Sequence, residues 1–432
     1  MLRINNFKRS YATFSNQARL PRLPIPALES TQERYKRSLL PLLSQADYER
    51  VSTTIDHFFK SELSSTLQKR LQDLDADNWL DQLWLKKAYL EYRIPTLINV
   101  NWWNQFQDFG LIPAEQSRSS AFCMHQLKNM FGTSRIAASG VDRVVTQWPC
   151  LAKHVNVIYK DQIFSVDVIG PQGETVSVKQ LEQQLRWVVE QVDNHPKQPP
   201  IGLLTTEHRD TWGPIREELE TQTINAKSLE NIDRSLFVFC LDDYSSSDDL
   251  SHRNMFHARN GRNRWFDKAL QFIVENNGRA GINGEHSPAD AVIPSRILDD
   301  ALASEPMQTE APTVNLAAPT RLNWDLSNRV QEAIKTAEIN ASKLIQDLDS
   351  VLLVYDGYGA DEMKKAKVSP DGWLQMAFQL AYYRQYGQPC PTYESASTRK
   401  FLKGRTETVR SCSVESVAFT KAWDDKDIKA SH

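Results

Sequence analysis

The segment Asn277-Gly-Arg-Ala-Gly-Ile-Asn-Gly-Glu-His-Ser-Pro-Ala-Asp290 sets one histidine, His286, between glycine-rich backbone and a Ser-Pro pair. Its glycines permit a tight backbone and the close approach of another group. A histidine held there can remove a proton from a hydroxyl or thiol near neutral pH. Asp290 could reach back to the ring if a helix begins here. The alternative interpretation is a histidine whose hydrogen bonds are satisfied inside a loop, and this segment alone supports both.

Composition narrows the class of protein. The chain has 432 residues, which makes two domains the default, and its 41% hydrophobic and 24% charged content is typical of a globular protein. A net charge of −3 argues against a nucleic-acid binder with a broad basic surface. No apolar run approaches the roughly 18 residues that a membrane span needs. The five cysteines are odd in number and widely spaced, which predicts neither a disulfide framework nor a zinc site.

Six histidines lack the surroundings of His286 and are interpreted as structural or exposed: His125, His154, His195, His208, His252 and His257.

The amino terminus differs from the rest of the chain in its composition. Residues 1–28 contain five Lys or Arg side chains and no acidic residue, with aromatic and aliphatic residues at helical spacing. This pattern predicts a mitochondrial presequence over residues 1–19, with Arg9-Ser-Tyr11 before Ala12 as a processing site. A disordered basic tail is the alternative.

Helices alternate with short strands along the chain, which predicts a mixed α/β fold. A Pro/Ala/Thr-rich stretch at Pro306–Pro319 is interpreted as a link between two structural units. The predicted helices are Leu28–Leu43, Ala46–Lys60, Ser64–Leu74, Asp77–Tyr92, Val176–His195, Thr211–Thr221, Ala226–Ser235, Ser327–Leu348 and Pro370–Tyr386. The predicted strands are Val155–Ile158, Ile163–Val168, Gly202–Thr205, Leu236–Leu241, Trp265–Val274 and Val351–Tyr355.

A lysine cluster, Lys364-Lys-Ala-Lys367, precedes an amphipathic helix that Ser369 caps, with Pro370 in its first position and Gly387 as its stop. Cations beside the amino terminus of a helix make a site for phosphate, because free backbone N–H groups add to the ammonium charges. A solvated basic turn is the alternative interpretation.

A cluster of hydroxyls follows. Tyr393, Ser395 and Thr406, with Arg405 beside them, could converge on a small carboxylate. The alternative is a hydrogen-bonded β-hairpin. The chain has no serine nucleophile elbow, no Walker A loop and no dinucleotide glycine fingerprint.

These blocks, in this order, resemble the choline/carnitine acyltransferase family. Thr406-Glu-Thr408 follows the carnitine type of the family, from which the choline type differs. The resemblance runs from residue 20 to about 420. Its motifs are Leu20-Pro-Arg-Leu-Pro-Ile-Pro-Ala-Leu28 with Thr31 and Tyr35, Arg264-Trp-Phe-Asp-Lys268 through Gly284-Glu-His-Ser287, Ser369-Pro-Asp371 through Gln375, Gln379-Leu-Ala-Tyr-Tyr383, Thr392-Tyr-Glu-Ser-Ala-Ser397 and Gly404-Arg-Thr-Glu-Thr408.

The resemblance implies an α/β fold of two domains similar to chloramphenicol acetyltransferase, each with a mixed sheet flanked by helices, the second being incomplete. The active site would lie in a tunnel at their interface. The implied ranges are 1–19 for the presequence, 20–89 for helices that belong with the carboxy-terminal domain, 90–327 for the catalytic domain with His286, and 328–432 for the partial carboxy-terminal domain.

The resemblance also implies the chemistry. His286 would be the general base for direct acyl exchange between coenzyme A and carnitine, with no acyl-enzyme, no metal and no cofactor, since coenzyme A is a substrate. Binding roles follow residue by residue from the motifs. Those for coenzyme A are Lys364, Lys365, Lys367, Ser369 and Asp371, and those for the carnitine carboxylate are Tyr393, Ser395 and Thr406.

Departures from the family leave alternatives open. Family members extend beyond Ala430-Ser-His432 with a Ser-Thr-Ser motif and a carboxylate-binding arginine, so a truncated, non-catalytic remnant that keeps coenzyme affinity is one alternative. Ala360 and Ala291 replace a lysine and a glycine common in the family. Choline as acceptor is a weaker alternative. The acyl group expected from the resemblance is acetyl or another short chain, while the exact length preference, a further peroxisomal signal and the oligomeric state are left open. The expected partners are acyl-CoA and carnitine, without nucleic acid, and the expected location is the mitochondrion.

Overall fold

The computed structural model describes residues 14, 16–74, 76–105, 121–247, 250–303 and 313–425. They fall into two units: the first spans Met1–Gln17, Asp81–Ser120 and Met124–Leu352, and the second spans Ala18–Leu80, Ala121–Cys123 and Leu353–His432. The predicted presequence, apart from Phe14 and residues 16–19, and the first half of the predicted link at 306–319 lie outside the described residues.

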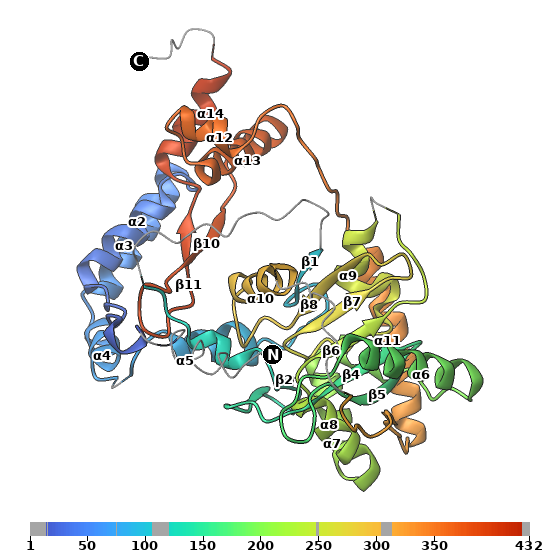
Figure 1. Cartoon of the computed structure of the whole chain (residues 1–432). Helices are drawn as coiled ribbons and strands as arrows, with labels where there is room; N and C mark the ends of the chain where they lie inside the picture. The colour runs from blue at the N-terminus through green and yellow to red at the C-terminus, as the bar shows by residue number, and fades with distance from the viewer. Residues whose placement is uncertain are drawn as a thin grey trace. The chain divides into compact units, whose positions relative to one another are not determined.

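The first unit is built on a seven-stranded sheet with the order β1-β8-β7-β6-β4-β5-β9 (Figure 1). The pairs β4–β6 and β6–β7 are parallel and the other neighbours are antiparallel, so the sheet is mixed, as predicted. Two further strands, β2 and β3, pair with each other. The strands are β1 (Trp102–Gln105), β2 (Thr133–Ile136), β3 (Arg143–Thr146), β4 (His154–Tyr159), β5 (Gln162–Asp167), β6 (Val238–Leu241), β7 (Gln271–Val274), β8 (Ala280–Gly284) and β9 (Thr320–Arg321).

The β4–β5 hairpin shows why the sequence forms these strands. Tyr159 pairs with Gln162, so only Lys160 and Asp161 form the turn, with φ of 47° and 66°. Two residues with positive φ give the turn whose twist matches that of the strands. This result confirms the predicted pair of strands.

Helices cover both faces of the sheet, and the alternation of side chains along each strand explains how. Val238 and Cys240 of β6 belong to a core with α7, α8 and α11, whereas Phe239 packs against the core of α6 on the other face. The helices of this unit are α5 (Asp81–Trp84), η2 (Leu85–Leu90), η3 (His125–Asn129), α6 (Val178–Asn194), η4 (Ile201–Thr206), α7 (Arg209–Glu220), α8 (Thr223–Arg234), α9 (Ser251–Gly261, non-helical at Ala258–Asn260), α10 (Val292–Ala303) and α11 (Asn328–Gln346).

The second unit combines helices from both ends of the chain with one hairpin. Lys36 pairs with Asp56 at 2.9 Å between α2 and α3, and Leu402 N donates to Pro21 O at 2.8 Å. Residues far apart in the sequence therefore share this unit. Its elements are α2 (Leu28–Leu39), α3 (Gln45–Phe59), α4 (Glu62–Gln72), α12 (Ala360–Lys365), α13 (Pro370–Tyr386), β10 (Tyr393–Ser397), β11 (Thr406–Arg410) and α14 (Val414–Trp423), while η1 (Gln17–Arg19) spans the boundary of the two units.

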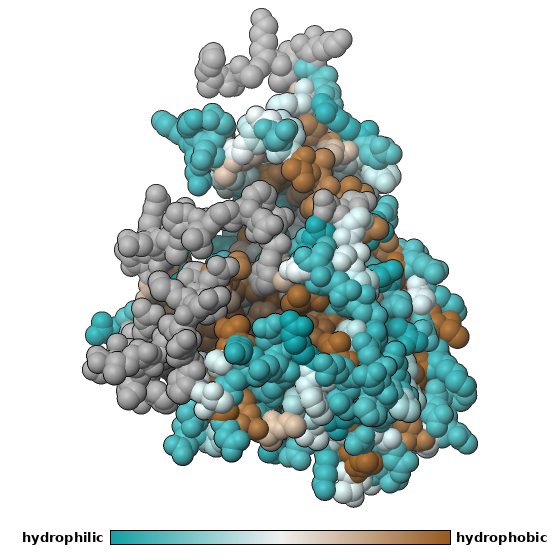
Figure 2. Space-filling model, turned by 45° about the vertical axis from the view of Figure 1, so that its right-hand side comes forward, coloured by the Kyte–Doolittle hydropathy of each residue, from teal (hydrophilic) through white to brown (hydrophobic). Residues whose placement is uncertain are grey.

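The helix α13 is confirmed with its caps. The Ser369 hydroxyl accepts a hydrogen bond from Gly372 N, and Gly387 ends the helix with φ of 70°. The amphipathic interpretation is wrong, because Gln379 is the one buried residue of the helix and large apolar side chains lie exposed on it. Hydrophilic residues cover much of the face in Figure 2, with hydrophobic residues gathered in patches. The exposed apolar residues of α13 are Trp373, Leu374, Phe378 and Tyr386.

Two predicted strands are wrong. Gly202–Thr205 lies in the 3-10 helix η4, because a short apolar run specifies burial but not the type of element. Val351–Tyr355 has no regular structure, and Leu353 is 84% exposed. No strand among the described residues pairs with this run, and pairing is what stabilises a strand.

Two other predicted elements are shorter than expected. Only Gln271–Val274 of the predicted strand Trp265–Val274 is extended in the sheet, and the residues before it form a buried loop. The predicted helix Asp77–Tyr92 reduces to the short α5 and the π-helical η2.

The two compact units begin and end at residues that differ from the predicted domain limits. Residues 20–80 share a unit with Leu353–His432, whereas α11 packs on η4 and α9 of the first unit. The domain limits implied by the resemblance stay a prediction. Within the described residues, no helix is both long and apolar enough to cross a membrane.

Candidate active site

His286 lies directly after β8, in the loop that leads to α10. Its side chain is 30% exposed, whereas Glu285, Ser287 and Asp290 around it are 6% exposed or less. A proton acceptor for a bound substrate must be both held and reachable, and a partly exposed ring in a buried loop meets both needs.

The ring nitrogen Nδ1 of His286 faces the protein. It lies 3.1 Å from the carbonyl oxygen of Ala289, 3.2 Å from the Tyr89 hydroxyl and 3.9 Å from Asp290 Oδ1. Because a carbonyl oxygen can only accept, the contact with Ala289 favours the tautomer with hydrogen on Nδ1. Nε2 is then the nitrogen that can take a proton.

Glycine before the loop is required by the packing of β8. A Cβ on Gly284 would overlap the indole ring of Trp102 and lie 2.6 Å from the carbonyl oxygen of Ala269. A Cβ on Gly281 would likewise lie 2.5 Å from Asn104 O. The close approach expected at these glycines is therefore made by the protein itself, through the neighbouring strand β1 and the residues before β7.

Tyr89 is a residue of the site that the sequence did not reveal. It lies in η2, a π-helical segment, and such segments occur frequently at functional sites. Its ring centroid is 5.3 Å from that of His286, and the residue is 8% exposed. No local signal separates Tyr89 from the other aromatic residues of its segment, so only the folded structure identifies it.

Asp290 does not share a helix with His286, because α10 begins at Val292. Its carboxylate nevertheless stays near the ring, since the side chain of Gln126 holds it. Asn129 Nδ2 donates to Pro288 O at 3.2 Å in the same loop. Two side chains of η3 thus tie down the loop after His286.

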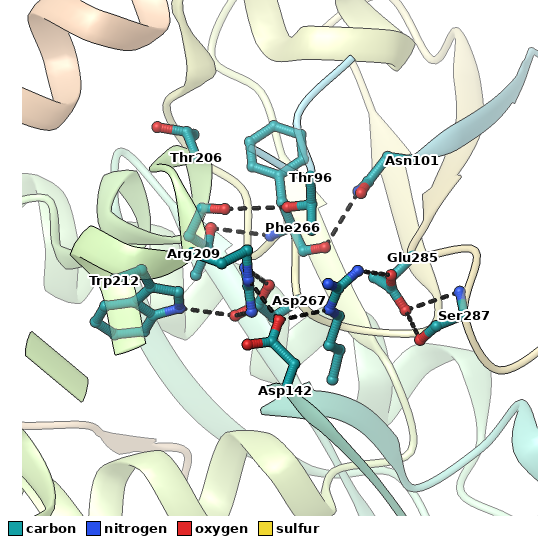
Figure 3. Close-up of polar contacts among 12 residues, drawn as sticks. Thr96, Asn101, Asp142, Thr206, Arg209, Trp212, Phe266, Asp267, Glu285 and Ser287 are labelled. Atoms are coloured by element: carbon teal, nitrogen blue, oxygen red, sulfur yellow. Dashed lines mark hydrogen bonds and ion pairs between the residues drawn. The ribbon is translucent and has the colours of Figure 1, made fainter. Parts of the chain in front are cut away.

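A buried ionic network lies next to the loop (Figure 3). Asp142 accepts hydrogen bonds from Arg93 at 2.8 Å, Arg135 at 2.7 Å and Arg209 at 2.6 Å. Burial by itself would raise the pKa of Asp142, but the charges of Arg209 and Arg135 outweigh it and hold the pKa below its ordinary value. The aspartate is therefore the charged centre of the network.

The network continues from Arg209 to Asp267 and Trp212. Arg209 donates to the two oxygens of Asp267 at 2.7 and 3.2 Å, and Trp212 Nε1 donates to Asp267 at 2.7 Å. Burial opposes the charge of Arg209, but the two aspartates raise its pKa. Figure 3 shows Trp212 at one end of the network and Glu285 with Ser287 at the other. Paired charges of this kind make a rigid support, because removing one partner would leave the other as an uncompensated buried charge.

The lysines predicted to bind phosphate lie in the second unit. Lys364 and Lys365 end α12, and Lys367, with φ of 59°, leads to the capping Ser369. All are exposed, and Lys365 forms an ion pair with Glu362 at 2.5 Å. The cluster thus directly precedes the amino terminus of a 17-residue helix, where the helix dipole favours an anion such as phosphate.

Asp371, in the first turn of α13, lies beside Glu394 of β10. The pKa of Glu394 is raised, first by desolvation and then by its hydrogen bond with Asp371 and the charge of that group. In addition, Gln379 Nε2 donates to Thr392 Oγ1 at 2.7 Å. The helix α13 and the β10–β11 hairpin therefore form one surface.

The predicted hydroxyl cluster lies on this hairpin. Ser397 pairs with Thr406, and alternate residues of a strand share a face, so Tyr393, Ser395 and Thr406 lie on one face. The residues form a hairpin, which was the alternative interpretation, and they also present their side chains together. Arg405, by contrast, is 7% exposed.

The predicted site residues thus form two groups. His286 belongs to the first unit, and the eight binding residues belong to the second. Within the second unit the lysine cluster, Asp371 and the hairpin lie on neighbouring elements.

Comparison with known proteins identifies the class. A model of the family described as Choline/Carnitine o-acyltransferase matches residues 23–111 and 108–432. Carnitine O-acetyltransferase of Homo sapiens is 34% identical over 96% of this chain and 73% of that protein. The Columba livia protein of the same name is 33% identical over 95% of this chain and 73% of its own length. Choline O-acetyltransferase of Mus musculus is 31% identical over 94% of this chain and 71% of that protein.

The chain is thus that of an acyltransferase, and its mixed sheet flanked by helices is consistent with the fold of that class. The chain belongs to the choline/carnitine O-acyltransferase family.

Proposed function

We propose that this protein is a carnitine O-acyltransferase that moves a short acyl group reversibly between coenzyme A and carnitine, with His286 as general base. The observation that supports it is the histidine ring, whose Nδ1 lies 3.1 Å from Ala289 O while the side chain stays 30% exposed. This leaves Nε2 to exchange protons with a substrate.

In the direction towards acylcarnitine, Nε2 of His286 takes the proton of the carnitine hydroxyl as its oxygen attacks the thioester carbonyl. The tetrahedral intermediate then expels the coenzyme A thiolate, which receives the proton from the imidazolium. The carboxylate of Asp290, 3.9 Å from Nδ1, stabilises the imidazolium between these two steps.

In the reverse direction the same nitrogen deprotonates the thiol of coenzyme A. A free thiol has a pKa of about 8.5, so a base is needed for rapid attack at neutral pH. The acyl group passes directly between sulfur and oxygen, and the reaction needs no cofactor besides its two substrates.

The second unit would hold the substrates. We assign the 3′-phosphate of coenzyme A to Lys364, with Lys365, Lys367 and Ser369 at the amino terminus of α13. Asp371 would accept a hydrogen bond from the adenine amino group, because it lies in the first turn of α13 beside the lysine cluster and a carboxylate oxygen accepts hydrogen bonds.

The hydroxyls of Tyr393, Ser395 and Thr406 would donate to the carnitine carboxylate from one face of the hairpin. Choline lacks this carboxylate, so kcat/KM measured with carnitine and with choline under the same conditions tests the acceptor. Carnitine should be preferred in the native protein, and Thr406→Val should weaken that preference. A higher kcat/KM for choline would refute the assignment.

The role of His286 is tested by acyl exchange in His286→Ala. We expect a loss of about 10²- to 10⁴-fold in kcat, the contribution typical of a general base. His195→Ala is the control, because His195 lies on an exposed loop after α6 and should change nothing. Full activity in His286→Ala would contradict the proposal.

Binding without turnover is the alternative function. Calorimetric titration of the native chain with coenzyme A, together with the exchange assay, separates the two. Binding with no exchange in the native chain would favour a coenzyme-binding protein.

We also propose a mitochondrial location, supported by the basic, acid-free composition of residues 1–28. Fusing these residues to a fluorescent protein tests it. Import into mitochondria is expected, and a diffuse signal would contradict the proposal.

A further inference from the structure

Arg135 is a fully buried arginine of β2 whose guanidinium holds two neighbours of His286 at once. Its Nη1 donates to Glu285 Oε1 at 3.0 Å, and its Nη2 donates to the carbonyl oxygen of Tyr89 at 2.7 Å. Its Nε donates to Asp142 at 2.7 Å, which fixes the plane of the group. All these partners are at most 8% exposed.

The Glu285 side chain links Arg135 to the residue that follows His286. While Oε1 accepts from Arg135, Oε2 accepts from Ser287 N at 3.0 Å and also from the Ser287 hydroxyl. One carboxylate therefore connects the residue before His286 to the residue after it. The backbone on both sides of the ring is therefore set by a single side chain, and Figure 3 shows the contact of Glu285 with Ser287.

Tyr89 provides the second connection. Its backbone is bound to Arg135, and its hydroxyl lies 3.2 Å from His286 Nδ1. The same guanidinium thus determines both the position of the loop that bears the ring and the position of the phenol that touches it. The planar guanidinium carries five N–H donors in a fixed fork-shaped arrangement and can make these contacts together. A lysine ammonium group cannot reproduce this fork.

We propose that Arg135 and Glu285 are a pair of positioning residues for the His286 imidazole. The inference rests on the proposed function of His286 and adds the structural device that sets its orientation. Neither side chain touches substrate in this proposal. They act by fixing the ring, so that Nε2 is presented to the acceptor hydroxyl or thiol in a reactive position.

The kinetic test is Arg135→Lys, which keeps the charge and loses the fork. We expect kcat to fall about 10²-fold, the cost of a displacement of about 1 Å in a reacting group, with KM values nearly unchanged. The matched control is Arg216→Lys. Arg216 is also buried, at 1% exposed, and pairs with Asp233 at 2.5 Å, but it has no contact with the loop among those described. Both variants should lose stability, and only Arg135→Lys should lose kcat. Equal kcat losses would overturn the proposal.

A spectroscopic test does not depend on turnover. In protein labelled with ¹³C-histidine, the resonance that disappears in His286→Ala is assigned to His286. It should shift or broaden in Arg135→Lys and stay in place in Arg216→Lys. An unchanged resonance in Arg135→Lys would overturn the proposal. If the native chain fails to exchange acyl groups but the resonance responds, the positioning role stands and the proposed function fails.

Glu285→Gln gives a second route if Arg135→Lys does not fold. This change removes the charge and one acceptor, and it should move the His286 resonance and lower kcat in the same direction. In the double variant the losses of kcat should be less than additive, because the hydrogen bond between Arg135 and Glu285 is weakened by either change alone. Fully additive losses would overturn the pairing.

Discussion

The side-chain amide of Gln126 holds Asp290 at two points: Oε1 accepts from Asp290 N at 2.7 Å, and Nε2 donates to Asp290 Oδ2 at 3.1 Å. This leaves Oδ1 as the oxygen that faces His286 Nδ1. The carboxylate is thus oriented by a residue 164 positions away in the sequence. Gln126 is 2% exposed, so solvent does not compete for these bonds.

Gln126→Leu should therefore impair function and stability together. Losing two buried hydrogen bonds costs about 1–3 kcal/mol in the free energy of unfolding. The loss of these bonds would release Asp290 and should also lower kcat about tenfold, because a small misplacement of a group beside the base has a cost of this size. The measurements are urea unfolding and steady-state acyl exchange.

Gln162→Leu is the matched control for this prediction. Gln162 is also 2% exposed and makes the same kind of paired contact, accepting from Gln198 N at 2.8 Å and donating to Gln198 O at 3.1 Å. It lies on β5 and should lose stability without losing kcat. An equal fall of kcat in both variants would mean that Gln126 acts on stability alone.

Gly284→Ala should destabilise the first unit strongly. The added methyl would overlap the Trp102 ring and crowd the backbone carbonyl of Ala269 at 2.6 Å, and a fully buried backbone carbonyl cannot move aside cheaply. We expect at least the 1–3 kcal/mol typical of overpacking, roughly, measured by thermal or urea unfolding.

Gly278→Ala distinguishes steric overlap from backbone strain. Gly278 has φ of +80°, and a methyl group added to it would meet no heavy atom within 4 Å. The change should cost only about 1 kcal/mol through its left-handed conformation. A smaller loss for Gly284→Ala than for Gly278→Ala would contradict the packing argument.

His257 should make stability depend on pH in the mildly acidic range. Burial, followed by the charge of Arg253, lowers the pKa of His257 from 6.5 to about 4. Between these values the unfolded chain binds the proton and the folded chain does not, so the stabilising contribution is present above pH 6.5 and is lost as the pH falls towards 4. The loss is at most about 3 kcal/mol from a shift of this size.

The check is urea unfolding of the native chain and of His257→Phe at pH 7.5 and at pH 4.5. The phenylalanine cannot titrate, so the variant should lose less stability on acidification than the native chain. The same pH dependence in both proteins would assign the effect to other groups.

Lys364→Ala should act on one phosphate of the coenzyme. We expect the KM for acyl-CoA to rise about tenfold, since a charged hydrogen bond contributes about 1.5–3 kcal/mol. The KM for the 3′-dephospho form, which lacks the phosphate, should stay as it is in the native protein. A rise of KM with both substrates would show that Lys364 supports the fold of the turn and does not bind the 3′-phosphate.

Local chemistry made part of this protein predictable. Helix α13 follows from Ser369, Pro370 and Gly387, because caps and backbone preferences act within a few residues. The β4–β5 hairpin follows from alternation and a short turn. His286 could be singled out because its neighbours in the sequence are also its neighbours in space.

Apolar runs were predicted less well. Gly202–Thr205 and Val351–Tyr355 have similar composition to strands, yet one is a buried 3-10 helix and the other is exposed. Hydrophobicity specifies a preference for burial, whereas the type of element depends on which partners the rest of the chain supplies.

By itself the sequence determined the family, the capped helix and the order of the motifs, and it singled out His286 as the candidate base, because these depend on short-range patterns. Only the tertiary structure brought Tyr89, Gln126 and Arg135 to the loop of His286. The physical reason is that these contacts join residues 150 to 197 positions apart, and the packing of the sheet, not any local preference, decides which distant side chains meet.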